Sequence, residues 1–176
     1  MHGKLGRSAR FVRDARLALI AGVGHVASAA RGLAVHGLGE AVRDRARSGR
    51  PVLGICVGMQ LLFEESEEGG SGLGLLRGPV RRLRARRVPH MGWNTLTATR
   101  ESRLLRGLDG SDVYFAHSYA AEPGDPTTTL AVVDHDVPIV AAVEAGAVAG
   151  VQFHPERSGA AGARLLENAL AWSRSV

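Results

Sequence analysis

Short apolar runs alternate with longer mixed stretches over the first third of the chain. Residues 17–21 and 51–53 are apolar, and a glycine follows each run, which is typical of a buried strand. Residues 27–47 have the length of a helix, weakened by three internal glycines and followed by a Ser-Gly stop at 48–49. A helical pattern resumes at 59–65. This order of strand, helix, strand and helix predicts parallel strands covered by helices.

The rest of the chain is dominated by strand-like runs. Turn sequences rich in glycine, proline and aspartate separate them, and residues 158–173 close the chain with a helical pattern. We therefore expect one α/β domain over residues 1–176 with an added β-rich layer. Residues 1–16 contain no apolar run, so we expect them to be atypical and disordered. The strand-like runs are residues 79–88, 93–97, 112–115, 129–134, 139–144 and 147–153.

Composition places the chain among soluble globular proteins. Its 176 residues are 45% hydrophobic and 22% charged, as in an ordinary single domain. No apolar stretch is long enough to span a bilayer, and residues 1–16 lack the apolar segment of a secretory signal. One cysteine cannot form an internal disulfide. These features predict a cytoplasmic protein without a membrane partner.

The net charge of +5 raises the possibility of nucleic-acid binding. The densest basic group is the set of six arginines between residues 77 and 87, and no aromatic residue is interleaved with them. Single-stranded nucleic acid is usually held on aromatic stacking platforms. We therefore favour a solvated strand face or the rim of a protein interface, and we expect no nucleic acid partner.

The one cysteine, Cys56, lies where a predicted strand meets a predicted helix. Gly54 and Gly58 flank it and permit a sharp turn that side chains would block. A helix N-terminus behind the sulfur favours the thiolate over the thiol. The segment is therefore interpreted as a nucleophile elbow. The alternative is a buried structural cysteine that packs as a small hydrophobic residue.

A nucleophilic thiol needs a base, and the base needs an orienting partner. His154 follows the apolar run that ends at Phe153, so it is predicted at the end of a strand, where ligands of α/β sheets bind. Pro155 stiffens the exit, and the Glu156 carboxylate can face the imidazole. His154 is the candidate base and Glu156 its partner. The alternative is a surface histidine beside a carboxylate.

Residues 54–60 and 154–156 together resemble the class I, triad-type glutamine amidotransferases. Residues 60–69, 88–94 and 115–119 resemble more specifically the glutaminase subunits of imidazole glycerol phosphate synthase. The resemblance implies a flavodoxin-like α/β fold, with a mostly parallel central sheet flanked by helices and an added antiparallel β layer. Members of this family begin with a βα unit that supplies a central strand. Residues 1–16 do not match it, so we expect the first βα unit to be missing.

The resemblance also implies a reaction and a set of site residues. Cys56 attacks the side-chain amide of glutamine and forms a thioester, releasing ammonia, with His154 and Glu156 completing the triad. Neither a cofactor nor a metal is implied. The oxyanion would be held by the amide of Val57 and by the loop residues Gly22, Val23 and Gly24. Glutamine would be bound by Gln60, Glu68, His117, Ser118 and Tyr119.

The implied partner is a cyclase subunit, a (β/α)₈ barrel that receives the ammonia. It would convert the nucleotide PRFAR into imidazole glycerol phosphate and AICAR, a step of histidine biosynthesis. The interface and ammonia exit would comprise Pro89, His90, Met91, Gly92, Trp93, Asn94, Tyr114 and Arg157. Two alternatives stay open: a truncated or inactive subunit that binds the cyclase without hydrolysing glutamine, and an amidotransferase that serves another synthase.

Overall fold

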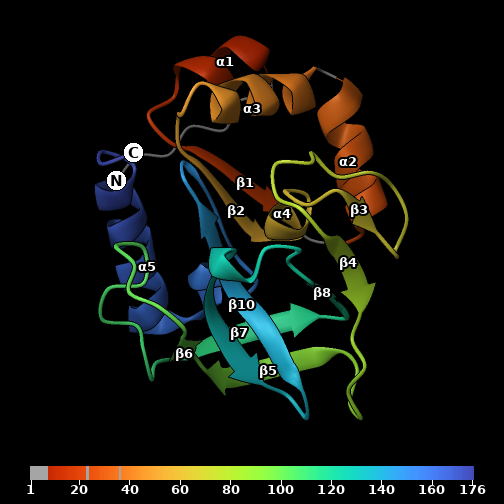
Figure 1. Ribbon diagram of the computed structural model, residues 1–176, viewed down its shortest axis with the longest axis vertical. Helices are drawn as coiled ribbons and strands as arrows, with labels where there is room; N and C mark the ends of the chain where they lie inside the picture. Colours follow the sequence, from red (N-terminus) through yellow and green to blue (C-terminus); the bar gives the residue numbers. More distant parts are fainter. Residues whose placement is uncertain (1–7, 23, 36) are drawn as a thin grey trace.

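A six-stranded sheet forms the centre of the protein (Figure 1). The computed structural model describes residues 8–22, 24–35 and 37–176. The strand order is β1-β2-β11-β10-β9-β6, so strands from both ends of the chain pair in the middle of the sheet. The strands are β1 (Ala18–Gly22), β2 (Val52–Cys56), β11 (Val148–Val151), β10 (Pro138–Ala145), β9 (Thr129–Asp134) and β6 (Thr97–Ala98).

This sheet is mixed, and the prediction of a mostly parallel sheet was wrong. β2 pairs in parallel with β1 and β11, whereas β10 pairs in antiparallel fashion with β11 and β9, and β9 does so with β6. The reason lies in the connection between β10 and β11, which consists only of residues 146–147. So short a connection can join only antiparallel strands, because a parallel pair needs a crossover.

β1 lies at an edge of the sheet and pairs directly with β2. β1 aligns with β2 over five residues, ending with Gly22 beside Cys56. β2 in turn pairs with β11. The three strands that lead to the predicted site are therefore contiguous.

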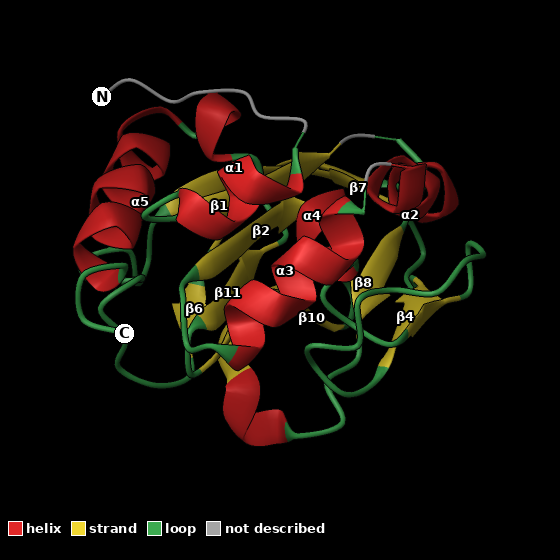
Figure 2. Ribbon diagram, turned by 90° about the horizontal axis from the view of Figure 1, so that it is seen from above, coloured by secondary structure: helices red, strands yellow, loops and turns green. Residues whose placement is uncertain are grey.

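Helices cover both faces of the sheet. α5 (Gly159–Trp172) packs through Leu165 and Ala169 against the face that carries Leu53 and Ile55 of β2. α3 (Leu38–Arg47) packs through Val42 with Val52, whose side chain points the other way because successive strand residues alternate. Figure 2 shows α3 crossing over the strands. No helix in the described ranges is long and apolar enough to span a membrane.

The predicted helix over residues 27–47 is two helices. α2 (Val26–Val35) ends before Gly37, whose φ of 62° and ψ of 19° place it in the left-handed region, and α3 begins at Leu38. Glycine adopts that conformation without the steric cost that a Cβ imposes. The two helices therefore run in different directions (Figure 1).

The N-terminal segment contains a helix that the sequence patterns did not indicate. α1 (Ala9–Asp14) begins after Ser8, whose hydroxyl accepts the amide hydrogen of Phe11. Arg45 of α3 is buried and donates to the carbonyls of Val12, Arg13 and Arg16 that end this segment. Of residues 1–16, which we expected to be disordered, 8–16 are ordered by these bonds; residues 1–7 lie outside the described residues.

Two small sheets form the predicted β-rich layer. Strands β5 (His90–Thr95) and β7 (Asp112–His117) pair in antiparallel fashion. The other sheet has the order β3-β4-β8, in which β3 and β4 are parallel and β4 and β8 antiparallel. Its strands are β3 (Glu65–Ser66), β4 (Pro79–Arg82) and β8 (Tyr119–Ala121). β7 and β8 border the cleft described below through His117, Ser118 and Tyr119.

Candidate active site

Cys56 occupies a sharp turn between β2 and the one-turn helix α4 (Val57–Gln60). Its φ of 53° and ψ of −114° are costly for a residue with a side chain. A Cβ on Gly54 would collide with the backbone of Gly58, and one on Gly58 would collide with the carbonyl of Ile20. The two glycines therefore permit the turn, as predicted. The helix is shorter than predicted, because α4 ends at Gln60 and the chain continues in turns.

The thiol of Cys56 is buried, with 4% of the residue exposed. Burial raises its pKa to about 11, and the Glu156 carboxylate acts in the same direction. Hydrogen bonds from the Val57 amide and the Gln152 side chain lower the pKa but do not offset burial. The Val57 amide at the start of α4 favours the thiolate, as expected at a helix N-terminus, but burial outweighs this effect.

His154 and Glu156 form a hydrogen-bonded pair at the end of β11. The amide of His154 donates to the Tyr114 carbonyl at 2.8 Å, which fixes the backbone where the short 3₁₀ turn Pro155–Arg157 begins. His154 Nδ1 lies 2.8 Å from Glu156 Oε1. A neutral imidazole that donates from Nδ1 to this carboxylate keeps Nε2 free to accept a proton. His154 is buried, whereas the Glu156 side chain is 60% exposed.

One cleft of about 490 Å³ brings the predicted residues together. A larger hollow of about 840 Å³ along residues 98–109 has neither a cysteine nor a histidine in its lining, so it offers no comparable chemistry. The smaller cleft therefore holds the candidate active site. It is lined by Gly24, His25, Cys56, Val57, Gln60, Glu68, Pro89, Met91, Ala116, His117, Ser118, Tyr119, His154, Glu156 and Arg157.

The predicted oxyanion donors lie beside the cysteine as far as the structure describes them. The Val57 amide begins α4 and faces the sulfur. Gly22 lies opposite Cys56 in the register of β1 and β2, and Gly24 lines the cleft with a φ of 89°. Val23 lies outside the described residues. The loop after β1 thus reaches the cleft from the strand adjacent to that of the nucleophile.

The predicted glutamine-binding side chains already have partners within the protein. Gln60 Nε2 donates to the Tyr119 carbonyl at 2.8 Å and to Gln152 Oε1 at 2.9 Å. Glu68 accepts the amide hydrogen of Val26 at 2.7 Å, and its other oxygen lies 2.9 Å from His25 Nδ1.

Two of these partners were missed by the sequence interpretation. His25 and Gln152 were not singled out, although Gln152 is only two residues before His154. Ser118 was also expected to bind glutamine, and its backbone carbonyl already accepts the amide hydrogen of Leu83 at 2.9 Å.

The predicted interface residues divide into an exposed and a buried set. Met91 and Trp93 are 65% and 59% exposed on β5. Trp93 faces Tyr114 across the β5–β7 pair, and Arg157 lies 4.0 Å above the Tyr114 ring. We had expected the His90 side chain to belong to this surface. Strand alternation instead turns it inward, and it is buried. Gly92 and Asn94 are half-buried, and Pro89 lines the cleft.

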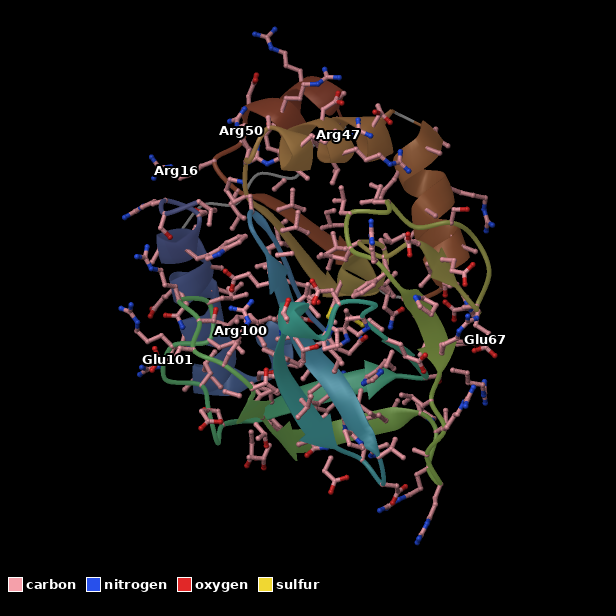
Figure 3. All side chains as sticks on the ribbon, viewed as in Figure 1. Arg16, Arg47, Arg50, Glu67, Arg100 and Glu101 are labelled. Carbon is pink, nitrogen blue, oxygen red and sulfur yellow. The ribbon has the colours of Figure 1, made fainter. Side chains whose placement is uncertain are left out.

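Acidic side chains lie beside the arginines of β4. Arg81 pairs with Glu65 at 3.3 Å, and Glu67 accepts the backbone amide hydrogen of Arg82. This favours the solvated strand face over a nucleic-acid site. Positive and negative side chains are also mixed around the rim of the molecule, as the labelled Arg16, Arg47, Arg50, Glu67, Arg100 and Glu101 show (Figure 3).

The elbow, the histidine–carboxylate pair and the mixed sheet define a class of protein. The profile of the family "Glutamine amidotransferase class-I" matches residues 11–172, so the chain belongs to the class I glutamine amidotransferases. The fold agrees: a crystal structure of a glutamine amidotransferase superposes with a TM-score of 0.78, covering 100% of this chain and 88% of the other at 20% identity.

Within this class, the chain belongs to the HisH family. It is 48% identical over 166 residues to imidazole glycerol phosphate synthase subunit HisH of Geobacillus kaustophilus, covering 89% of this chain and 79% of the relative. It is 42% identical to the subunit of the same name from Mycolicibacterium paratuberculosis, covering 94% and 86%.

Proposed function

We propose that this protein hydrolyses glutamine through a thioester on Cys56 and delivers the ammonia to a cyclase subunit. That subunit would be a (β/α)₈ barrel that converts PRFAR into imidazole glycerol phosphate and AICAR. One observation carries the proposal: a cysteine in a strained turn shares a cleft with a histidine whose Nδ1 is held by a carboxylate. The relationship to the HisH subunits supports the choice of partner.

The reaction follows from these contacts. His154 Nε2 accepts the thiol proton as Cys56 Sγ attacks the side-chain amide carbon of glutamine, and Glu156 stabilises the resulting imidazolium. The C–N bond breaks, and ammonia leaves with the proton that His154 returns. Water then attacks the thioester, His154 takes a proton from it, the C–S bond breaks and the thiol is restored as glutamate leaves. The Val57 amide would stabilise the oxyanion in both steps.

Proton transfer to His154 has to accompany the attack, because the thiol is protonated in the resting state. A pKa of about 11 leaves little thiolate at neutral pH. His154 therefore has to act as a general base while the sulfur attacks.

The proposed cyclase surface surrounds Trp93. The exposed Met91 and Trp93 supply apolar and aromatic area, which is enriched at protein interfaces. Arg157 stacks on Tyr114 next to them and lines the cleft, so this surface adjoins the active site. Ammonia released at Cys56 would therefore emerge beside the docked partner.

The test measures glutamate release with the cyclase subunit and its nucleotide substrate present. The wild-type chain should release glutamate, and Cys56→Ala should abolish release while still binding the cyclase. A glutamine-analogue electrophile should form an adduct at Cys56. Cyclase binding without release and without an adduct would instead establish the non-catalytic alternative.

A further inference from the structure

A chain of buried polar side chains runs beneath the cleft to the sulfur of Cys56. Its last member is Gln152, which has no exposed surface. Gln152 Nε2 donates to Cys56 Sγ at 3.6 Å, and Gln152 Oε1 accepts from Gln60 Nε2 at 2.9 Å. Gln60 donates its second amide hydrogen to the carbonyl of Tyr119 at 2.8 Å.

The backbone carbonyl of Tyr119 determines the orientation of both amides. A carbonyl oxygen can only accept, so Gln60 must present its NH₂ group there. The same NH₂ group faces Gln152, which must therefore turn its oxygen toward Gln60. Its own NH₂ group is left facing the sulfur of Cys56. The amide that contacts the nucleophile is thus oriented by a group on β8, a strand distant in sequence.

The same carbonyl orients two buried histidines. His117 Nδ1 lies 2.8 Å from the Tyr119 oxygen, so Nδ1 must carry a hydrogen and donate it. In a neutral ring Nε2 is then an acceptor. His90 Nδ1 lies 3.0 Å from that nitrogen and must donate to it. His90 Nε2 then accepts from Asn94 Nδ2 at 3.2 Å. Asn94 belongs to β5, the strand that exposes Trp93.

Both histidines are neutral in this arrangement, because each uses one ring nitrogen as a donor and the other as an acceptor. Burial favours the same neutral state, because it lowers the pKa of His90 to about 4 and that of His117 to about 3. Buried polar chains are costly unless every member is paired, and apolar residues of similar volume would often be more stable. Here every buried polar side-chain atom in the described part of the chain has a partner.

We propose that Gln152 is a positioning residue for the Cys56 nucleophile, and that its amide is oriented through Gln60 by the carbonyl of Tyr119. This rests on the proposed function, in which Cys56 is the nucleophile. Gln152 holds the sulfur in place and donates a hydrogen bond that stabilises the thiolate as it forms.

Alkylation of Cys56 by iodoacetamide tests the proposal without glutamine or cyclase. Gln152→Met keeps the shape of the side chain and removes the donor, so alkylation at about pH 8 should slow about tenfold. Gln60→Met removes the amide that turns the Gln152 oxygen away from the sulfur, and it should slow alkylation about threefold. The double variant should be no slower than Gln152→Met, because both changes act through one amide.

A nearby residue outside the chain supplies the control. The His135 ring stacks on that of His90 with centroids 4.2 Å apart, but its Nε2 bonds to the Arg87 carbonyl. His135→Phe should leave the alkylation rate unchanged. If Gln152→Met does not fold, Gln60→Met alone should still slow alkylation. Unchanged rates, or additive effects of Gln60→Met and Gln152→Met, would overturn the proposal.

Different results would contradict the proposed glutamine hydrolysis and the positioning role of Gln152. Absence of glutamate release with the cyclase present, together with slower alkylation in Gln152→Met, would contradict the proposed activity alone. Normal glutamate release with unaltered alkylation in Gln152→Met would contradict the positioning role alone. Slower alkylation in both single variants, with no further slowing in the double variant, would support the positioning role.

Discussion

The carboxylate of Glu68 binds His25, with 2.9 Å between Oε1 and Nδ1. Its other oxygen accepts the amide hydrogen of Val26 at the start of α2. One side chain thus ties the loop after β1 to the loop between β3 and β4. Glu68 is also our candidate for binding the α-ammonium group of glutamine. The substrate must therefore share this carboxylate with the imidazole or displace it.

Substitutions at Glu68 and His25 should have opposite effects on glutamine binding. Glu68→Gln removes the negative charge and should raise KM about tenfold, with a smaller effect on kcat. His25→Ala frees one carboxylate oxygen and should lower KM about twofold. Steady-state glutaminase assays with the cyclase present measure both. A higher KM in His25→Ala would show that the imidazole itself contacts glutamine.

Glu156→Gln should separate thiol reactivity from catalysis. The Glu156 charge raises the pKa of Cys56, so its removal should increase the rate of alkylation by iodoacetamide. The same change weakens His154 as a base and should lower kcat about a hundredfold. Glu167→Gln neutralises an exposed carboxylate on α5 and is the matched control. A parallel fall of both rates would contradict the assigned role of Glu156.

Two glycine-to-alanine substitutions should change stability in opposite directions. A Cβ on Gly58 would meet the backbone of Ile20, which cannot move without displacing β1, so Gly58→Ala should destabilise the fold by about 3 kcal/mol or more. Gly32 lies inside α2 with open space around it, and Gly32→Ala should stabilise by about 0.5–1 kcal/mol. Urea denaturation measures both. A tolerated Gly58→Ala would contradict the tight elbow.

Stability should fall in mild acid because His90 and His117 are buried as neutral groups. Their pKa values of about 4 and about 3 lie below the value of about 6.5 in an unfolded chain. The unfolded state therefore binds more protons below about pH 6.5, and stability decreases as the pH falls through this window. At about pH 5 the loss should be about 2 kcal/mol for each histidine.

Urea denaturation at about pH 7.5 and pH 5 measures this loss, and His90→Phe supplies the comparison. The variant lacks one of the two groups, so it should lose about 2 kcal/mol less than the wild type between the two pH values. An equal loss in both proteins would show that other groups dominate the acid sensitivity.

Local motifs predicted the parts of the site that depend on neighbouring residues. Cys56 lies between glycines, and His154 precedes a proline and a carboxylate, so both patterns are visible over a few residues. The division of residues 27–47 into two helices depends on the left-handed conformation of Gly37, one of three glycines in that stretch. Nothing in the local pattern indicates which of the three ends the helix.

Long-range pairing accounts for what the sequence interpretation missed. The mixed sheet depends on which strands meet, and helix α1 is held by Arg45, about thirty residues away. Gln152 gained a role only because its amide lies between Gln60 and Cys56. Partners so far apart in sequence leave no short-range periodicity.

The sequence by itself determined the class of chemistry, because a nucleophile, a base and its partner need particular side chains within short motifs. Only the tertiary structure decided the pKa values of those groups and the hydrogen bonds that orient them. Burial raises the pKa of Cys56, and the Tyr119 carbonyl turns the Gln152 amide toward the sulfur. Desolvation and hydrogen-bond direction depend on what surrounds each group in space, and that environment is assembled from strands distant along the chain.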